Sequence, residues 1–178
     1  MQVDLSKYDN SWYKPGNTVK RFLWYYCNIV FFRNGWFPFS SLKVFLLKLF
    51  GASVGKAVTI KPNVGIKYPW FLTIGNFVWI GEEVWIDNLA HVTIGNNVCI
   101  SQGALLLSGS HNYKLPAFDL IIKKINIEEG VWVCAKAIIC GGVTCYKNAI
   151  ITAGTVMTSD CEAGGIYKGN PGILYKKR

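Results

Sequence analysis

Aliphatic residues recur at every sixth position through most of this chain. The series comprises Val54, Ile60, Ile66, Ile74, Ile80, Ile86, Ile94, Ile100 and Leu106 and, after an interruption, Ile127, Val133, Ile139, Cys145, Ile151 and Met157. A six-residue period fits neither an α-helix nor a paired hairpin. It predicts a parallel β-helix in the mainly β class, where each hexad makes one short strand and one corner.

The frame of this repeat slips in a regular way before the interruption. Val54, Ile74 and Ile94 are each twenty residues apart, which is two more than three hexads. We expect the extra pairs, 72–73 and 92–93, to bulge at one corner of the coil. From Ile127 onward the six-residue step is strict.

Glycine often follows the aliphatic residue of a hexad. Examples are Gly55, Gly75, Gly81 and Gly95. We expect these glycines where the chain must turn tightly, because glycine has no Cβ to restrict the backbone. The aliphatic residues should stack inward from coil to coil, so that most of the repeat is scaffold.

The residues before the repeat predict an arm followed by two helices. Residues 1–17 are polar and aromatic and include Pro15 and Gly16, which indicates an extended arm. Apolar residues in 18–32 have helical spacing and cover nearly the whole surface of the helix, which favours burial against the rest of the protein and leaves a membrane-surface contact open. Ser40 or Ser41 can cap a second helix over 42–50 that covers the open end of the coil.

These patterns divide the chain into three parts. Residues 1–53 form the arm and helices, and 54–162 form the β-helix, with an inserted loop at 107–126. Residues 163–178 leave the repeat and form a C-terminal tail.

Composition and charge narrow the function classes. The 178 residues are 51% hydrophobic and 16% charged with a net charge of +9, which predicts one folded domain and suggests an anionic partner. The alternative is that the positive charge only keeps the protein soluble. The basic residues are dispersed and form no recognised nucleic-acid module, so we expect no nucleic-acid partner.

Cysteine and histidine usage favours a reduced, metal-free protein. The six cysteines form no C-x-x-C pair, and there are only two histidines, His91 and His111. The N-terminus does not resemble a signal peptide, and the apolar stretch 22–32 is too short to span a bilayer. We therefore expect a cytoplasmic protein that could also lie at the inner face of the membrane.

Several segments together carry a family resemblance. They are DLSKYDNSWYKPG, LFGASVGK, IKPNVGIKYPW, IDNLAHVTIG, SGSHNY and GNPG. The chain resembles the hexapeptide-repeat acyltransferases over nearly its whole length. Within them it resembles the colanic-acid biosynthesis acetyltransferases, relatives of the galactoside and maltose O-acetyltransferases. The resemblance implies a left-handed β-helix, a homotrimer with active sites between subunits, and acetyl-CoA as cosubstrate.

His111 is the first candidate for catalysis. It lies in Ser108–Tyr113, at the start of the longest interruption of the repeat, and loops on rigid scaffolds often carry function. A neutral histidine can take a proton from a sugar hydroxyl near pH 7. The resemblance implies that the histidine of this motif is the general base. The alternative is that His111 is an exposed loop histidine without a catalytic role.

Four further residues are candidates near the reacting groups. By resemblance, the amide of Asn88 could donate to the thioester oxygen, although a corner asparagine would serve equally well in a turn. Asp87, His91 and Tyr113 are candidates for binding the acceptor. His91 precedes His111 by twenty residues, and so could lie one coil below it.

The donor site is predicted along the later coils. The motif match places Ala135, Ala153 and Thr158 where family members contact the pantetheine arm of CoA. Lys176 and Lys177 could meet the CoA phosphates or be part of a solvated tail. Ser159 and Ile173 stand where basic residues are common in the family, which leaves the phosphate contacts open.

These observations predict an O-acetyltransferase. It would transfer acetyl from acetyl-CoA to a sugar hydroxyl of an exopolysaccharide precursor, directly, in a ternary complex. The alternatives are N-acetylation of an amino sugar or antibiotic, and a non-catalytic trimeric scaffold. A zinc enzyme on the same coil would need three histidine ligands, one more than the chain contains.

Overall fold

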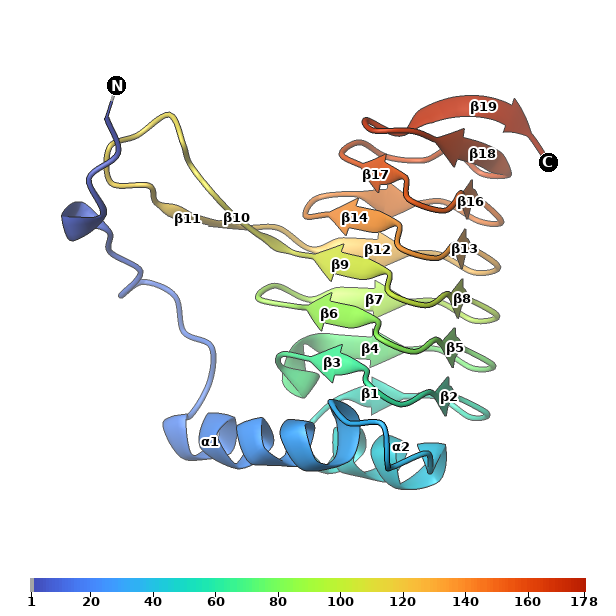
Figure 1. The fold of residues 1–178 in the computed structure, drawn as a ribbon, viewed down its shortest axis with the longest axis horizontal. Coiled ribbons are helices and arrows are strands. Elements are labelled where there is room, and N and C mark those ends of the chain that lie inside the picture. Colours follow the sequence, from blue (N-terminus) through green and yellow to red (C-terminus); the bar gives the residue numbers. More distant parts are fainter. Residues whose placement is uncertain (1) are drawn as a thin grey trace.

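In the computed structural model, which describes residues 2–178, short parallel strands wind into a stacked three-sided coil with two helices at one end (Figure 1). Sheet A contains β1 (Ser53–Val54), β4 (Leu72–Ile74), β7 (Val92–Ile94), β12 (Ile125–Ile127) and β15 (Thr144–Cys145). Sheet B contains β2 (Thr59–Ile60), β5 (Trp79–Ile80), β8 (Cys99–Ile100), β13 (Trp132–Val133), β16 (Ile150–Ile151), β18 (Gly165–Lys168) and β19 (Ile173–Lys177). Sheet C contains β3 (Gly65–Ile66), β6 (Trp85–Asp87), β9 (Leu105–Leu107), β14 (Ile138–Cys140) and β17 (Val156–Met157).

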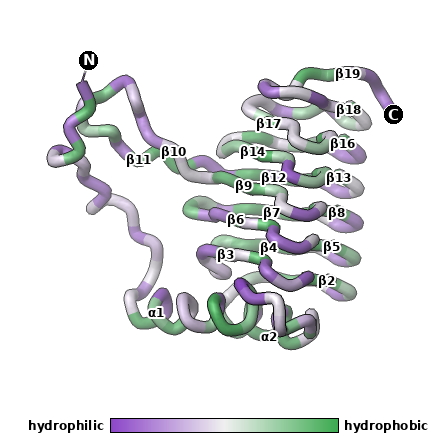
Figure 2. Tube along the Cα trace, viewed as in Figure 1, coloured by the Kyte–Doolittle hydropathy of each residue, from purple (hydrophilic) through white to green (hydrophobic). Residues whose placement is uncertain are grey.

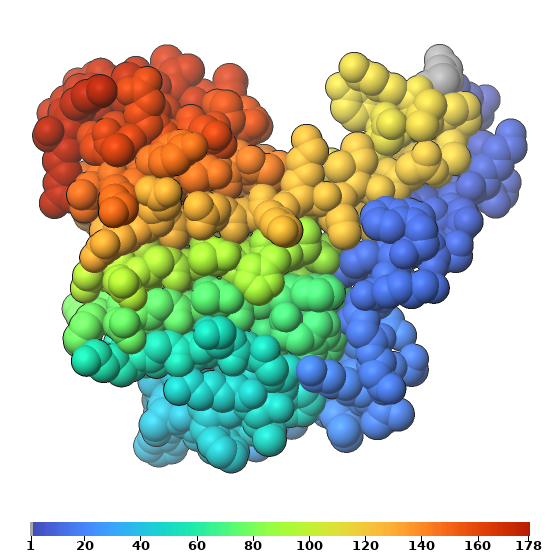
Figure 3. Space-filling view, turned by 180° about the vertical axis from the view of Figure 1, so that it is seen from behind, coloured from blue at the N-terminus to red at the C-terminus, as the bar shows by residue number. Residues whose placement is uncertain are grey.

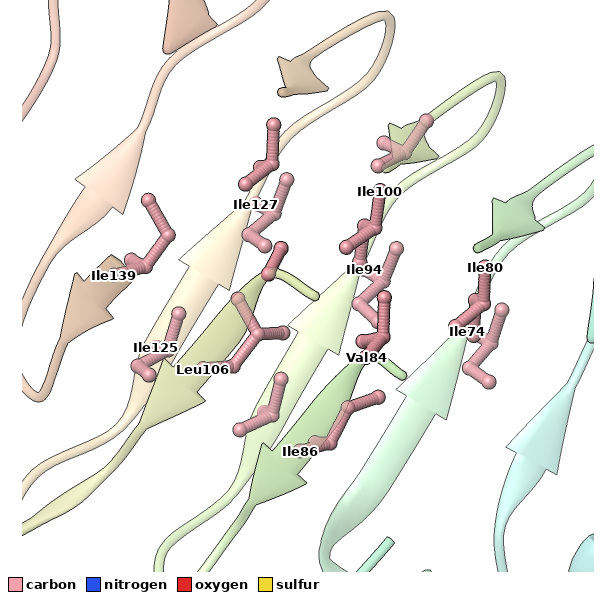
Figure 4. Close-up of a cluster of buried hydrophobic side chains, with 14 of the residues drawn as sticks. Ile74, Ile80, Val84, Ile86, Ile94, Ile100, Leu106, Ile125, Ile127 and Ile139 are labelled. Carbon is pink, nitrogen blue, oxygen red and sulfur yellow. The ribbon is translucent and has the colours of Figure 1, made fainter. Parts of the chain in front are cut away.

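The hexad aliphatics form the core, as the period predicts. In sheet A, Ile74 pairs with Ile94, and Ile94 pairs with Ile127, so identical side chains stack from coil to coil (Figure 4). The strict step after Ile127 is confirmed, because every hexad aliphatic from there to Met157 is fully buried. Each such side chain contributes about 1.5–3 kcal/mol by leaving water.

The extra residues of the early coils lie elsewhere than predicted. Residues 72–73 and 92–93 are regular members of β4 and β7 and pair in register with each other. The additional length is taken up just before these strands, in 67–71 and 88–91. The first of these segments contains a 3-10 turn, η3 (Pro69–Phe71). The bulge therefore falls at the corner between sheet C and sheet A.

The hexad glycines serve close packing between coils. A Cβ on Gly81 would lie 2.8 Å from the backbone nitrogen of Gln102, and one on Gly95 would lie 2.8 Å from that of Glu129. The left-handed backbone occurs two residues later, at Glu83 with φ 59° and Asn97 with φ 55°. The glycines lie at the corners, as predicted, but the reason for glycine there is the neighbouring coil, which leaves no space for a side chain, and not the backbone conformation of the turn.

Both predicted helices are present, at one end of the coil. α1 (Thr18–Cys27) continues into a π-helical turn, η2 (Asn28–Phe32), and α2 (Ser40–Leu49) packs on β1 and β2. No side chain caps α2. Ser40 Oγ instead accepts a hydrogen bond from the Ile60 nitrogen at 3.0 Å, which ties the helix to the first coil.

The helices bury less apolar surface than predicted. Of α1 and η2, only Trp24 and Phe32 are buried. Figure 2 shows hydrophobic residues along both helices. Many of their large apolar side chains are exposed, and we call this set the helical apolar face: Val19, Phe22, Leu23, Tyr26, Ile29, Val30, Trp36, Phe39, Leu42, Phe45 and Leu49. Burial against the rest of the protein, which the 18–32 pattern favoured, therefore holds for Trp24 and Phe32 and not for the exposed residues of this segment.

Lys43 lies at the buried side of α2. Its side chain is fully buried, and its Nζ donates to the Lys61 carbonyl oxygen at 2.9 Å. Burial lowers the pKa of Lys43 to about 8, because an ammonium loses its hydration there.

The coil continues beyond the predicted boundary at residue 163. β18 pairs in parallel with β16, so the last coil extends to Lys168, and β19 then folds back antiparallel on β18. Of the predicted tail, only the part after Lys168 leaves the repeat.

The arm and the inserted loop meet outside the coil. Residues 2–17 are extended except for one 3-10 turn, η1 (Leu5–Lys7), as predicted. The loop consists of β10 (Gly109–His111) and β11 (Leu120–Ile122), which pair antiparallel and project from the coil. The arm lies against this loop, and an open notch separates the loop from the last coils (Figure 3). The Asp4 nitrogen donates to the Pro116 carbonyl oxygen at 2.9 Å.

Candidate active site

The irregular segments of the early coils all fall at one corner of the coil. Residues 67–71, 88–91 and 108–124 each connect a strand of sheet C to a strand of sheet A. The arm runs along the same corner. Trp70 Nε1 donates to the Pro15 carbonyl oxygen at 3.0 Å, and the Tyr13 hydroxyl donates to the Leu89 carbonyl oxygen at 2.7 Å. This corner is the only one so covered within residues 2–178.

Ser108 fixes the base of the loop. Its hydroxyl is buried, donates to the Asp87 carbonyl oxygen at 2.9 Å, and accepts from the Ala90 nitrogen at 3.0 Å. The loop therefore leaves a rigid position on the coil, and the pairing of β10 with β11 carries His111 outward from it.

The ring of His111 is held in one tautomer. Its Nδ1 lies 2.9 Å from the carbonyl oxygen of Phe118, a residue with a left-handed φ of 53°. A carbonyl oxygen can only accept, so Nδ1 carries the hydrogen and the lone pair is on Nε2. The Phe118 ring stacks on the imidazole, with ring centroids 4.4 Å apart. The ring of Tyr8, in the arm, also lies near the imidazole, with ring centroids 5.6 Å apart. Nε2 can therefore accept a proton.

His111 separates two cavities. The first, the corner cavity, has a volume of ≈ 270 Å³ and is lined by Leu107, Ser108, His111, Tyr113, Cys140 and Gly141, among others. The second, the arm cavity, has a volume of ≈ 320 Å³ and is lined by Tyr8, Tyr13, Arg21, Tyr68, Leu89 and His111, among others. His111 thus lines two spaces, each large enough for part of a substrate. Tyr113, a candidate for binding the acceptor, is 72% exposed and lines the corner cavity and not the arm cavity.

Asn88 is committed to the scaffold. Its side chain is fully buried, and its Nδ2 donates to the carbonyl oxygens of Tyr68 and Phe71, the latter at 3.1 Å. Its Oδ1 accepts from the Tyr68 nitrogen at 3.0 Å. Both amide hydrogens are therefore used within the corner, and none is left for a thioester. Here Asn88 shapes the turn that presents Tyr68 to the arm cavity.

Asp87 and His91 lie behind the site. Asp87 is nearly buried and pairs with Lys67, with Nζ 2.9 Å from Oδ1, so it reaches the arm cavity only through Lys67. His91 Nε2 lies 3.0 Å from Thr73 Oγ1 and borders neither cavity. Burial, and then the Lys124 ammonium, lower the pKa of His91, which favours a neutral ring. The expected stacking of His91 under His111 fails because β10 turns out of the coil.

The predicted donor residues lie on two different corners. Thr158 follows β17 at the corner between sheets C and A, in line with Cys140 of the corner cavity. Ala135 and Ala153 follow β13 and β16 at the corner between sheets B and C. One chain therefore does not bring these three residues together.

Lys176 and Lys177 lie in β19 at the C-terminal end of sheet B. The Nζ of Lys177 lies 3.2 Å from a carboxylate oxygen of Glu162, and Lys176 Nζ lies 5.8 Å from the ring centre of Tyr175. Both side chains are exposed. Their strand lies in sheet B, which is a different face of the coil from the one that carries the corner cavity.

The cationic and aromatic wall of the arm cavity was not predicted. It consists of Tyr8, Tyr13, Arg21, Lys67 and Tyr68. The arm and the IKPNVGIKYPW segment entered the sequence analysis only as family motifs. Both segments are rich in tyrosine and basic residues, and this shared composition was the signal in the sequence that could have indicated a common binding site. Burial raises the pKa of Tyr13, so its hydroxyl stays protonated and donates to Leu89.

Two further findings concern metal ions and membranes. Within residues 2–178, no three His, Cys, Asp or Glu side chains gather in a group that could hold a metal ion. Across the same residues, no helix has the length and apolar character needed to cross a bilayer.

Comparisons with known proteins place the chain among acetyltransferases. It is 33% identical over 168 residues to WcaF of Escherichia coli (strain K12), provisionally named a colanic acid biosynthesis acetyltransferase. The matched region covers 93% of this chain and 91% of that protein. The fold matches a hexapeptide-repeat acetyltransferase from Vibrio cholerae with a TM-score of 0.80 at 20% identity, covering 89% and 90% of the chains. It also matches a galactoside acetyltransferase in complex with coenzyme A, with a TM-score of 0.71 at 24% identity, covering 89% and 80%. No family model matches the chain.

Proposed function

This chain belongs to the hexapeptide-repeat acetyltransferases, in the family of WcaF, and from that premise we propose that it transfers acetyl from acetyl-CoA to a sugar hydroxyl of an exopolysaccharide precursor. The observation that carries this proposal is the position of His111. His111 lines both cavities, and its tautomer leaves Nε2 with the lone pair. A base placed between two substrate spaces suits direct transfer between them.

The reaction then follows from this geometry. The acetyl thioester enters the corner cavity, and the sugar enters the arm cavity, whose tyrosines can stack on it. Nε2 takes the proton of the acceptor hydroxyl while its oxygen attacks the thioester carbonyl. The tetrahedral intermediate expels the CoA thiolate, which takes the proton back from the imidazolium. No acyl-enzyme forms, and the products are the sugar ester and free CoA.

The surface proposed to bind CoA, which we call the donor groove, supports a homotrimer. The related galactoside acetyltransferase was solved with coenzyme A, and this fold offers the line of Cys140 and Thr158 above the corner cavity for the pantetheine arm. Ala135 and Ala153 lie on another corner, so they can join that groove only from a neighbouring copy. Sheet B carries Trp79 and Trp132, both exposed and in one register line, as an apolar strip for such a neighbour. Lys176 and Lys177 would meet the CoA phosphates at the far end.

The decisive experiment is acetyl transfer with a panel of acceptors. Purified protein is incubated with acetyl-CoA and glycans that offer either hydroxyl or amino groups, and free CoA and acetylated product are measured. Products bearing an O-acetyl ester are expected. Transfer only to amines would replace the proposal with N-acetylation, and binding without any transfer would favour a scaffold.

The helical apolar face supports peripheral contact with an anionic membrane. Phe22 on this face is 60% exposed, and residues 17–51 contain five basic side chains, of which only Lys43 is fully buried, and no acidic ones. Apolar side chains with a basic surround suit the interface of anionic lipids. We expect the helices to lie on the lipid surface and not to cross it.

Vesicle co-sedimentation tests this contact. Wild-type protein should sediment with phosphatidylglycerol vesicles more than with phosphatidylcholine vesicles. The double variant Phe22→Glu, Ile29→Glu should lose this binding, whereas Tyr146→Ser, an exposed control on a distant coil, should keep it. Equal binding by the double variant, or self-association through the face that lipid does not alter, would refute the contact.

A further inference from the structure

A third cavity extends the arm cavity toward the helices. It has a volume of ≈ 310 Å³ and is lined by Arg21, Tyr25, Arg33, Lys67, Tyr68 and Trp85, among others. Arg21, Lys67 and Tyr68 also line the arm cavity. The two cavities therefore adjoin at these three residues, and we call them together the groove; His111 lines one of them, and Arg33, beside η2, lines the other.

Two of the three cations that line this groove are not neutralised by the protein. Lys67 is paired with Asp87 at 2.9 Å. Within residues 2–178, no carboxylate lies within ion-pair distance of Arg21 or Arg33. Among residues 2–178, Asp87 is the only acidic side chain that forms an ion pair with a lining residue, and neither lining contains an acidic residue, so the groove keeps an excess of positive charge.

Arg21 is held in place with hydrogen-bonding capacity left over. One of its terminal nitrogens donates to Thr18 Oγ1 at 3.3 Å. Its Nε is buried and has no hydrogen-bond partner among residues 2–178. Part of the hydrogen-bonding capacity of this guanidinium is therefore unused by the protein, and Arg21 lines both cavities. Guanidinium groups bind the oxygens of a phosphate in pairs, with geometry that matches their fork.

We propose that Arg21 and Arg33, with Lys67, form an anion-binding subsite for a phosphate or diphosphate group carried by the acceptor sugar. This proposal rests on the proposed function, because it assigns the arm cavity to the sugar. The sugar lies between Tyr8, Tyr13 and Tyr68, with its hydroxyl at His111. Its phosphate lies farther along the groove, at the guanidinium groups.

The test measures acceptor binding with the donor site already filled. His111→Ala protein saturated with CoA is titrated by calorimetry with methyl glucoside, glucose 1-phosphate, UDP-glucose and a short-chain prenyl-diphosphate glucose, and then with the same panel built on galactose. We expect at least one phosphate-bearing probe to bind about 10- to 100-fold more tightly than its methyl glycoside, as charge-assisted hydrogen bonds would give. The nucleotide and prenyl probes show which carrier the groove accepts.

Matched variants locate the effect. Adding Arg21→Gln and Arg33→Gln to this protein should remove the preference for the phosphate-bearing probe. Lys136→Gln with Lys147→Gln, which removes the same charge from two exposed corners of the coil, should retain it. Circular dichroism confirms that each variant is folded. A single Arg21→Lys variant, which keeps the charge and loses the fork, should fall between the two.

The failures of the two proposals are distinguishable. Acetylation of sugars with no phosphate preference, or a preference that survives both arginine substitutions, would overturn the subsite and leave the proposed function standing. An arginine-dependent phosphate preference without transfer to any sugar would support the subsite and overturn the proposed activity.

Discussion

The imidazole of His111 and the phenyl ring of Phe118 lie parallel, with 6° between their planes, while the Phe118 carbonyl accepts the hydrogen of Nδ1. One residue thus fixes both the tilt of the ring and its tautomer. The hydrogen bond and the stacking come from different parts of Phe118, so substitution can separate them.

Phe118→Leu should keep the carbonyl and remove the stacking. The imidazole would then rotate more freely, and we expect kcat to fall several-fold, up to about tenfold, with little change in the KM for acetyl-CoA. Steady-state kinetics with a fixed acceptor measures both constants. An unchanged kcat would show that the hydrogen bond alone orients His111.

His111→Asn should abolish the base and keep the fold. The asparagine amide can still donate to the Phe118 carbonyl, but it cannot take a proton, and we expect kcat to fall about 10²- to 10⁴-fold. The assay follows release of the CoA thiol. His91→Asn is the matched control, and its activity should stay near that of the wild type. A His111→Asn protein of normal activity would remove His111 from the mechanism.

Asn88→Ala separates positioning from direct catalysis. It removes three hydrogen bonds and leaves buried backbone groups of Tyr68 and Phe71 without partners, so the free energy of unfolding should fall by about 3 kcal/mol. Urea denaturation measures this loss. A variant of normal stability but severely reduced kcat would instead support direct contact with the thioester.

Tyr13→Phe should loosen the arm. It deletes the hydrogen bond from the arm to the Leu89 carbonyl, and we expect the KM for the acceptor to rise about 3- to 10-fold. The KM for acetyl-CoA should not change, because the arm does not border the corner cavity. Tyr146→Phe, on a distant coil, is the control. Equal changes in both KM values would contradict the division of substrates between the two cavities.

Lys43 should make stability depend on alkaline pH. Its pKa is about 8 in the folded protein, below the ordinary value of 10.5, so between these pH values the unfolded chain binds more protons. Stability contributed by Lys43 therefore rises from pH 8 to pH 10.5, by about 3 kcal/mol.

Lys43→Met removes that rise. The measurement compares the urea midpoints of wild type and variant at several pH values. The comparison is needed because Cys27, whose pKa burial raises to about 11, lowers stability over part of the same range in both proteins. A constant difference between the two proteins across the range would show that Lys43 is not desolvated.

The solenoid could be predicted because its determinants are periodic. The buried side chains of Ile80, Ile100 and Val133 occupy one register line, and each follows from the hexad count within its own segment. The role of Gly81 could not be predicted in the same way. What restricts Gly81 is the Gln102 backbone of the next coil, and packing between coils has no signature in the local sequence.

The candidate site was predictable only in part. His111 stands out because it interrupts the repeat. Tyr8 and Arg21 reach the same place from the arm and from α1, and no period relates them to residue 111. Asn88 resembles a catalytic amide in sequence, but only the structure shows that its hydrogens are taken up by Tyr68 and Phe71.

The contact between Asp4 and Pro116 has a consequence for synthesis on the ribosome. Chains emerge N-terminus first at about 5–20 residues per second, so the arm leaves the exit tunnel long before the loop it joins. Until then, the coils from β1 to β9 can form and stack, while the arm has only Trp70 and Leu89 to bind. Closure of the active site must therefore be a late event in the maturation of each newly made chain.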